Sequence, residues 1–345
     1  MTRIGVVGTA SFYGPDYAHR IAERGDASVA GVVPDRDVSD SMLETLGRPT
    51  REELATTADC SLYGSVGELL AADPDGVVVA SPTTRRADDA VTVLETGTPV
   101  LTAKPAAATA ADARRIAAAA AEVDAPALTT TPARFDTAIR EGVERVRRGD
   151  VGEPVSATAT IRHDRVPKAG IEHNAEHAPD QAGSVLAMGY YTADLLRWAV
   201  GSRIDRVSGW VRNANTPHSS HPDTGVATVE HGTDVLSTMR MLYATDCRER
   251  LGNWELEVVG TDGVIRTSHV GYEGIQWNAG SPTERSANLF GRDASPVLDR
   301  QLSAFLEAIR TDAYPAVAPG AQRAADALAA CEAWADGPDP TEPEH

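Results

Sequence analysis

The sequence predicts an α/β protein with two domains: an N-terminal Rossmann domain with a doubly wound parallel sheet, and a C-terminal α/β domain with an open mixed, mostly antiparallel sheet. Three observations support this prediction. The chain has 345 residues, more than one ordinary hydrophobic core accommodates. Apolar runs and helical patterns alternate in the first third, which is typical of a parallel sheet. Later strand-like runs follow one another across short glycine-rich turns, which favours antiparallel pairing. We expect residues 1–126 and 127–345 to form the two domains.

Short, almost continuous apolar runs predict the strands of the first domain. The run Gly76–Ala80 (GVVVA) is typical of a strand that is buried on both faces. Thr109 followed by Asp112 resembles a capping box at the start of an alanine-rich helix. The expected strands are 3–8, 29–33, 76–80, 99–102 and 126–130. The expected helices are 15–22, 65–72, 86–96 and 109–123.

The second domain shows period-two alternation in several runs separated by turns such as Gly232-Thr233-Asp234. Apolar residues recur near helical spacing within 183–200, which predicts a helix there. The expected strands are 155–162, 207–212, 225–231, 235–243, 254–259 and 263–267. The other expected helices are 137–149, 296–311 and 321–335.

Amino-acid composition limits the environments and the classes of partner that we expect for this protein. The formal net charge is −18, which argues against a nucleic-acid partner because a phosphate backbone attracts a basic surface. Of the 32 basic residues only Lys104 and Lys168 are lysines, a halophile-like composition suited to concentrated salt. We expect no membrane-spanning segment and no secretion signal, because the apolar runs are short and the first residues lead directly into a strand-like run. Its three cysteines fit no disulfide or metal spacing, so we expect a cytoplasmic protein.

A loop after the first strand is the candidate pyrophosphate site. Such a site needs a strand, a tight glycine turn and a helix N-terminus, whose backbone N–H groups hold the anion. Gly8 ends the strand, Ala10 stands where a second glycine is usual, and Gly14 comes late. The candidate cofactor-binding residues of this loop are Gly8, Ala10, Ser11 and Phe12.

A carboxylate after the second strand is the candidate ribose ligand. Asp35 follows Gly14 at about the spacing at which an acidic residue binds the adenosine ribose hydroxyls. Arg36 beside it offers a partner for a 2′-phosphate, so the sequence favours NAD and leaves NADP open. The alternative is that Asp35 is only a turn residue.

Three further segments carry motifs that belong together. Ser81-Pro82 follows the expected strand 76–80, and Ala103-Lys104-Pro105 follows the expected strand 99–102. The stretches 133–155 and 182–201 complete the set. These segments resemble the glucose–fructose oxidoreductase / inositol dehydrogenase / rhizopine catabolism family (Gfo/Idh/MocA). That family has Thr-Pro and Glu-Lys-Pro at the first two places, a similar entry into its second domain, and a Gly-Gly-x-x-Leu-Asp-x-Gly-x-His-x-x-Asp helix. The resemblance covers nearly the whole chain. It implies a polyol, cyclitol or sugar substrate, a cofactor site that includes Ser81, Pro82 and Lys104, and a homodimer or homotetramer formed through the second sheet.

The resemblance also implies a catalytic pair. Tyr191 stands at the family's histidine position, and tyrosine is used there in some branches of the family. A free tyrosine has a pKa of about 10, which a neighbouring ammonium lowers. We therefore expect Tyr191 to exchange the proton of the reacting hydroxyl and Lys104 to stabilise the anion. His177 is the candidate substitute for the family's aspartate, which is Ala187 here. No metal is expected, because His173 and His177 lack a fitting third ligand.

Departures from the family pattern keep two alternatives open. Ala187 and Ala103 replace acidic residues, and Arg85-Arg86 stand where a histidine is expected. One alternative is a dinucleotide-binding sensor or regulatory protein without redox activity. The other is non-redox net chemistry, such as elimination or glycoside cleavage through transient oxidation.

Overall fold

The computed structural model describes residues 1–45, 47–162, 183, 185–214, 222–242, 254–268, 271–276, 284–287, 296–315 and 317–337. This part of the chain forms two compact units. The first comprises Met1–Thr131 and Leu298–Ala325, and the second comprises the described residues from 132 to 297 and from 326 onward. Each unit contains one sheet, and the predicted fold class is confirmed for both.

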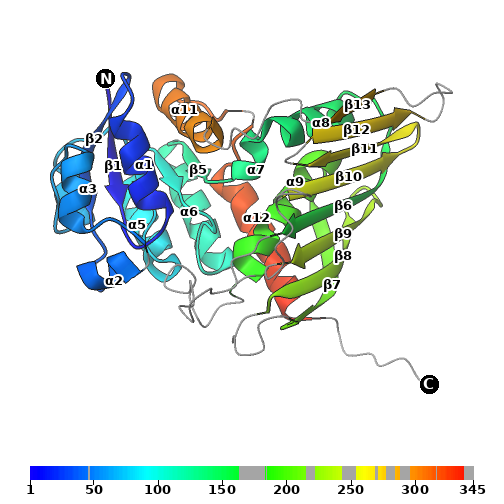
Figure 1. Ribbon diagram of the computed structural model, residues 1–345, viewed down its shortest axis with the longest axis horizontal. Coiled ribbons are helices and arrows are strands. Elements are labelled where there is room, and N and C mark those ends of the chain that lie inside the picture. The colour runs from blue at the N-terminus through cyan, green and yellow to red at the C-terminus, as the bar shows by residue number, and fades with distance from the viewer. Residues whose placement is uncertain are drawn as a thin grey trace. The chain divides into compact units, whose positions relative to one another are not determined.

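The first unit is a five-stranded parallel sheet with helices around it (Figure 1). Its strands are β2 (Ala27–Val33), β1 (Thr2–Val7), β3 (Gly76–Val79), β4 (Val100–Thr102) and β5 (Ala127–Thr129), in that spatial order. Val77, Val78 and Val79 are fully buried, as expected for a strand covered on both faces. The carboxyl ends of these strands share one edge of the sheet, where ligands bind in open α/β folds.

Helices follow the strands of the first unit in the expected order. They are α1 (Tyr13–Ala22), α2 (Asp40–Thr45), α3 (Arg51–Thr57), α4 (Val66–Leu70), α5 (Thr83–Leu94), α6 (Ala110–Val123) and α11 (Pro296–Thr311). The predicted cap of α6 is present, since the Thr109 hydroxyl accepts a hydrogen bond from the Asp112 N–H at 3.0 Å. The short helices α2 and α3 were not expected, because their polar turns show no helical apolar spacing.

The units differ from the expected division at residue 126 in two respects. Strand β5 continues the first sheet by pairing with β4, so the first unit extends past residue 126. Helix α11 also returns to the first unit and packs tightly on β3. A side chain at Gly76 would come within 2.6 Å of Ile309, so the glycine allows this close packing.

The second unit is built on an eight-stranded sheet. Its strands are, in spatial order, β13 (Glu284–Ala287), β12 (Gly271–Gln276), β11 (Gly263–Ser268), β10 (Trp254–Gly260), β6 (Pro154–Arg162), β9 (Leu236–Leu242), β8 (Thr224–His231) and β7 (Ile204–Arg212). Strands β6 and β9 pair in parallel, and the other neighbouring pairs are antiparallel. The sheet is therefore mixed and mostly antiparallel, as predicted. Strands β12 and β13 were not foreseen.

Helices cover one face of the second sheet (Figure 1). They are α7 (Pro132–Phe135), α8 (Thr137–Arg147), α9 (Tyr190–Val200) and the second half of α12 (Ala321–Ala335). The expected helix 183–200 is divided, because a π-helical turn, η2 (Val185–Gly189), precedes α9. The indole of Trp334 is fully buried beside Gly189 and Gly225, at both of which an added Cβ would lie within 3.1 Å of its ring. Within the described residues, none of the helices combines the length and the hydropathy that crossing a bilayer requires.

Candidate functional site

The glycine loop joins β1 to α1 by a close backbone approach. Gly8 has a φ of +96°, and a Cβ on it would lie 2.3 Å from the Ser81 nitrogen. A Cβ on Gly14 would lie 2.0 Å from the Gly8 carbonyl oxygen. Gly14 therefore has the role of the third glycine of a dinucleotide fold, which allows close packing of helix on strand.

Because of this packing, a methyl group added at Gly14 should affect stability and cofactor binding far more than one added at an open position. Gly14→Ala should lower the free energy of unfolding by about 1–3 kcal/mol or more, because backbone must move to admit the Cβ. It should also weaken NAD binding by displacing the loop. Gly25→Ala is the matched control, since a Cβ on Gly25 meets nothing within 4 Å. Urea unfolding and NADH fluorescence titration measure both effects, and equal behaviour of the two variants would contradict this account of Gly14.

Asp35 holds the glycine loop from the end of β2. Its side chain is 1% exposed. Its Oδ2 atom accepts hydrogen bonds from the Thr9 and Ala10 N–H groups, both at 2.8 Å. Its Oδ1 atom accepts a hydrogen bond from Arg85 Nη2 at 2.7 Å. Asp35, the predicted ribose ligand, thus lies beside the loop. It also anchors the loop and forms an ion pair with Arg85, and the spacing of residues in the sequence predicted neither of these contacts.

The remaining loop residues lie in the same region. Ala10 and Ser11 are buried, and Ser11 Oγ accepts a hydrogen bond from the Tyr13 N–H at 3.2 Å. The exposed ring of Phe12 lies 5.7 Å from the Arg48 guanidinium carbon. Arg36 is exposed and donates a hydrogen bond to the Gly64 carbonyl oxygen.

The ends of β3 and β4 supply the other candidate residues. Ser81 and Pro82 follow β3, and Lys104 follows β4 with 7% of its surface exposed. Buried Arg86 joins these two ends: its Nε donates to the Ser81 carbonyl oxygen at 2.9 Å, and its Nη1 donates to that of Pro105. Because β1, β2, β3 and β4 are parallel neighbours, all candidate cofactor residues lie at one edge of the sheet. The joining role of Arg86 was missed, since the sequence showed it only as a departure from the family pattern.

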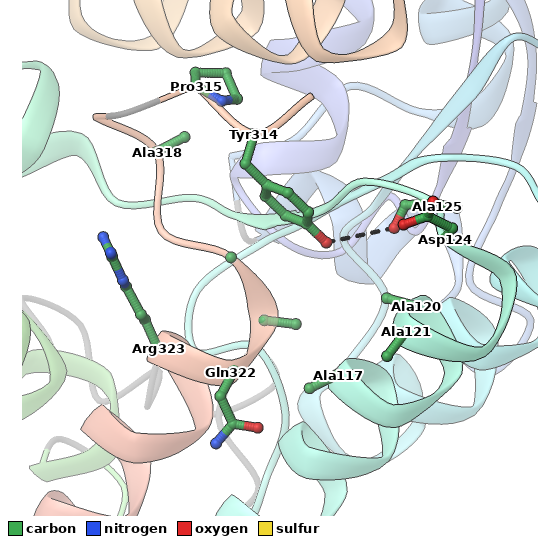
Figure 2. A pocket seen from close by; sticks show the side chains of 12 residues that line it. Ala117, Ala120, Ala121, Asp124, Ala125, Tyr314, Pro315, Ala318, Gln322 and Arg323 are labelled. Carbon is green, nitrogen blue, oxygen red and sulfur yellow. Dashed lines mark hydrogen bonds between the residues drawn. The ribbon is translucent and has the colours of Figure 1, made fainter. Parts of the chain in front are cut away.

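A cavity of about 580 Å³ lies elsewhere in the first unit (Figure 2). Small side chains of α6 line one wall, and Tyr314 reaches across it to the Ala125 carbonyl oxygen at 3.4 Å. Arg323 and Gln322, which complete the lining, are exposed. None of the candidate cofactor residues lines this cavity.

Tyr191 lies in the second unit, in the first turn of α9. It is 5% exposed, and its ring centroid is 5.7 Å from that of Trp254 and 6.1 Å from that of Tyr190. The turn before it, which contains Ala187, is π-helical, a geometry frequent at functional sites. The predicted partners Lys104 and Tyr191 thus belong to different units. His177, the third candidate, lies outside the described residues.

Asp194, three residues beyond Tyr191, forms a buried ion pair. Its two carboxylate oxygens accept hydrogen bonds from Arg134 Nε and Nη2, both at 2.7 Å, and the two side chains are 2% and 1% exposed. The Arg134 guanidinium carbon also lies 4.9 Å from the Trp198 ring centroid. This geometry gives Asp194 a structural role.

Both halves of the chain match models of one protein family. Residues 2–130 match the model of the oxidoreductase family with an NAD-binding Rossmann fold, and residues 139–266 match the GFO/IDH/MocA C-terminal domain. The first unit is therefore an NAD-binding Rossmann domain of an oxidoreductase family. The chain belongs to the Gfo/Idh/MocA family, as the resemblance of its motifs predicted.

Three known proteins are similar to this chain. Inositol 2-dehydrogenase 1 of Saccharopolyspora erythraea is 30% identical over 60% of this chain and 56% of its own length. Inositol 2-dehydrogenase 3 of the same organism is 26% identical over 89% of this chain and 85% of its own length. An oxidoreductase domain protein from Kribbella flavida is 20% identical, with a TM-score of 0.80 over 97% of this chain and 98% of that chain. This chain therefore spans little more than half of the first of these relatives, and the structural match concerns the fold alone.

Proposed function

We propose that this protein is an NAD-dependent dehydrogenase that oxidises a CH–OH group of a sugar, a cyclitol or a related polyol. The observation that carries the proposal is the glycine loop. A Cβ on Gly8 or Gly14 would lie within 2.3 Å of neighbouring backbone, so only glycine fits there, and Asp35 fixes the loop through two N–H groups. Similarity to inositol dehydrogenases supports the class of substrate.

The residues at the sheet edge fit a dinucleotide. Ser11 and Phe12 would hold the pyrophosphate with backbone N–H groups at the start of α1. Gly8 and Ala10 would shape the loop around it, because their own N–H groups donate to the Val33 carbonyl oxygen and to Asp35 Oδ2. Ser81 and Pro82 would line the path toward the nicotinamide. Ser81 Oγ is buried close to the Asp89 carboxyl, so the proposed path carries a polar group at this point. When bound, the nicotinamide supplies the hydride chemistry.

Two side chains are assigned the proton chemistry in this proposal. Tyr191 Oη takes the proton from the reacting hydroxyl, and the Lys104 ammonium stabilises the phenolate and orients the substrate oxygen. The burial of both residues supports the assignment, because charge interactions strengthen where water is excluded. His177 is the proposed substitute for the acidic group that Ala187 lacks.

An activity screen separates this proposal from the sensor alternative. Purified protein is titrated with NAD and NADP in molar KCl, which suits its net charge of −18. It is then mixed with inositols, hexoses and linear polyols while the absorbance of reduced nicotinamide is followed. Growth of that band with one compound class supports the dehydrogenase. Tight dinucleotide binding without turnover across the panel would favour the sensor.

The second sheet supports a proposal for assembly into a homodimer or homotetramer. Trp210 and Val226 are cross-strand neighbours on β7 and β8 and are 61% and 46% exposed. Leu236 of β9, which pairs with Glu230 farther along β8, is 54% exposed. Large apolar side chains on an exposed sheet face are typical of an interface. Within the described residues Cys60 and Cys331 are free thiols, which is compatible with the proposed cytoplasmic location.

A charge on this face should disrupt the assembly. We expect Trp210→Glu to convert the oligomer into monomers, because a carboxylate buried at the interface loses its hydration. Met42→Glu, on the 48% exposed Met42 of α2, is the matched control and should leave the oligomer intact. Light scattering coupled to size-exclusion chromatography measures both masses. A monomeric native protein, or an unchanged mass for Trp210→Glu, would contradict this interface.

A further inference from the structure

Arginine side chains gather around the carboxyl end of β2, which the proposed function makes the adenosine end of the cofactor site. Arg51 Nη2 donates to the Asp35 carbonyl oxygen at 3.4 Å, and Arg48 Nε donates to that of Ala10 at 3.4 Å. Arg36 follows Asp35 directly in the chain. This cluster is notable in a chain whose net charge is −18.

Arg85 differs from these three because it pairs with the buried carboxylate of Asp35. It comes from the first turn of α5, 50 residues after Asp35 in the sequence. Its Nη2 lies 2.7 Å from Asp35 Oδ1, and its Nη1 lies 3.4 Å from Asp37 Oδ2. The Arg85 side chain is 38% exposed whereas that of Asp35 is 1% exposed, so one part of the guanidinium faces solvent above a buried carboxylate.

This pairing changes what Asp35 does at the site. Its Oδ2 atom already accepts two backbone N–H groups, and its Oδ1 atom accepts Arg85. A free carboxylate at this position binds the ribose diol and repels a 2′-phosphate, which is how such sites select NAD. Here the negative charge is balanced by a guanidinium, so most of that repulsion is removed.

We propose that Arg85 is the residue that sets cofactor preference, and that it allows this protein to bind NADP with an affinity comparable to that for NAD. The inference rests on the proposed dinucleotide site and extends it to the 2′ position of the adenosine ribose. Arg85 neutralises Asp35 and offers its exposed N–H groups to a 2′-phosphate. Arginine suits this role because its planar guanidinium binds a carboxylate and a phosphate at the same time.

Fluorescence titration of NADH and NADPH at one fixed KCl concentration tests the proposal without requiring turnover. The native protein should bind the two within about tenfold of each other. Arg85→Gln should weaken NADPH about tenfold or more, because it exposes the Asp35 charge and removes a phosphate donor. It should change NADH affinity by about threefold or less. Arg85→Lys should restore only part of the NADPH affinity, because it returns the charge but not the planar fork of donors.

Two controls separate this role from general damage. Arg114→Gln removes an exposed guanidinium of α6 and should leave both affinities unchanged. Thermal unfolding of Arg85→Gln shows whether the first unit is still folded. If it is not, Arg85→Lys is compared with the native protein instead.

Three outcomes are decisive. Native protein that binds NADH but not NADPH would overturn the inference and leave the proposed function intact. An equal loss of both affinities in Arg85→Gln would make Arg85 merely structural and would also overturn it. Native protein that binds neither dinucleotide would contradict the proposed function itself.

Discussion

Tyr191→Phe is expected to lower turnover with the best polyol about a hundredfold or more while leaving the affinity for NADH unchanged. The substitution removes one hydroxyl and keeps the ring against Trp254, so packing of the second unit is retained. Stopped-flow reduction of NAD, together with NADH titration, separates the chemical step from binding. Tyr190→Phe on the same helix is the matched control, because it removes a neighbouring hydroxyl to which no catalytic role is assigned.

Lys104→Ala should produce a loss of similar size, since the phenolate then lacks its counter-charge. Lys104→Arg should not restore the rate, because the larger guanidinium does not fit where a compact ammonium fits. Near-native turnover in Tyr191→Phe or in Lys104→Ala would remove that residue from the mechanism. If Lys104→Arg is fully active, Lys104 provides only a positive charge.

Asp194→Ala is expected to destabilise the second unit by about 3–5 kcal/mol, because it leaves the Arg134 guanidinium buried without its carboxylate. The comparison with an exposed pair is direct. Arg197 and Asp326 also lie 2.7 Å apart, but their side chains are 20% and 36% exposed, so Arg197→Ala should cost about 1 kcal/mol or less. Urea unfolding at constant KCl concentration measures both differences.

The double variant Arg134→Met, Asp194→Leu sharpens this test. Replacing both charges by apolar groups of similar size should recover much of the stability lost in Asp194→Ala. Equal losses in Asp194→Ala and Arg197→Ala would show that the buried pair contributes no more than a surface pair.

The sequence predicted most of the fold because its apolar runs have the right period. Val77, Val78 and Val79 are buried as a continuous run requires, and Thr109 caps its helix as expected. Strands β12 and β13 were missed for physical reasons. β12 (GYEGIQ) contains two glycines that interrupt the alternation, and β13 (ERSA) has four residues and no large apolar side chain. Their positions follow from pairing with β11 and with each other rather than from local pattern.

The sequence predicted which residues form the candidate site, but it did not predict the contacts among them. Motif spacing placed Gly8, Asp35, Ser81 and Lys104 at strand ends, which the parallel sheet brings to one edge. The ion pair between Arg85 and Asp35 joins residues 50 apart in the chain, and no periodicity reveals it.

The pair in the second unit was missed for the same reason. Arg134 and Asp194 are 60 residues apart, and the sequence showed Arg134 only as part of a linker. Such pairs depend on how elements pack together, which local sequence does not determine.

The central claim is that Lys104 and Tyr191 act on one substrate oxygen beside the nicotinamide. A crystal structure of the protein with bound NAD and an inositol measures this directly. The proposal predicts that Lys104 Nζ and Tyr191 Oη both lie within about 3 Å of the same hydroxyl oxygen, or reach it through one water. Either group lying beyond that reach, with another side chain bonded to the reacting oxygen, would contradict the claim.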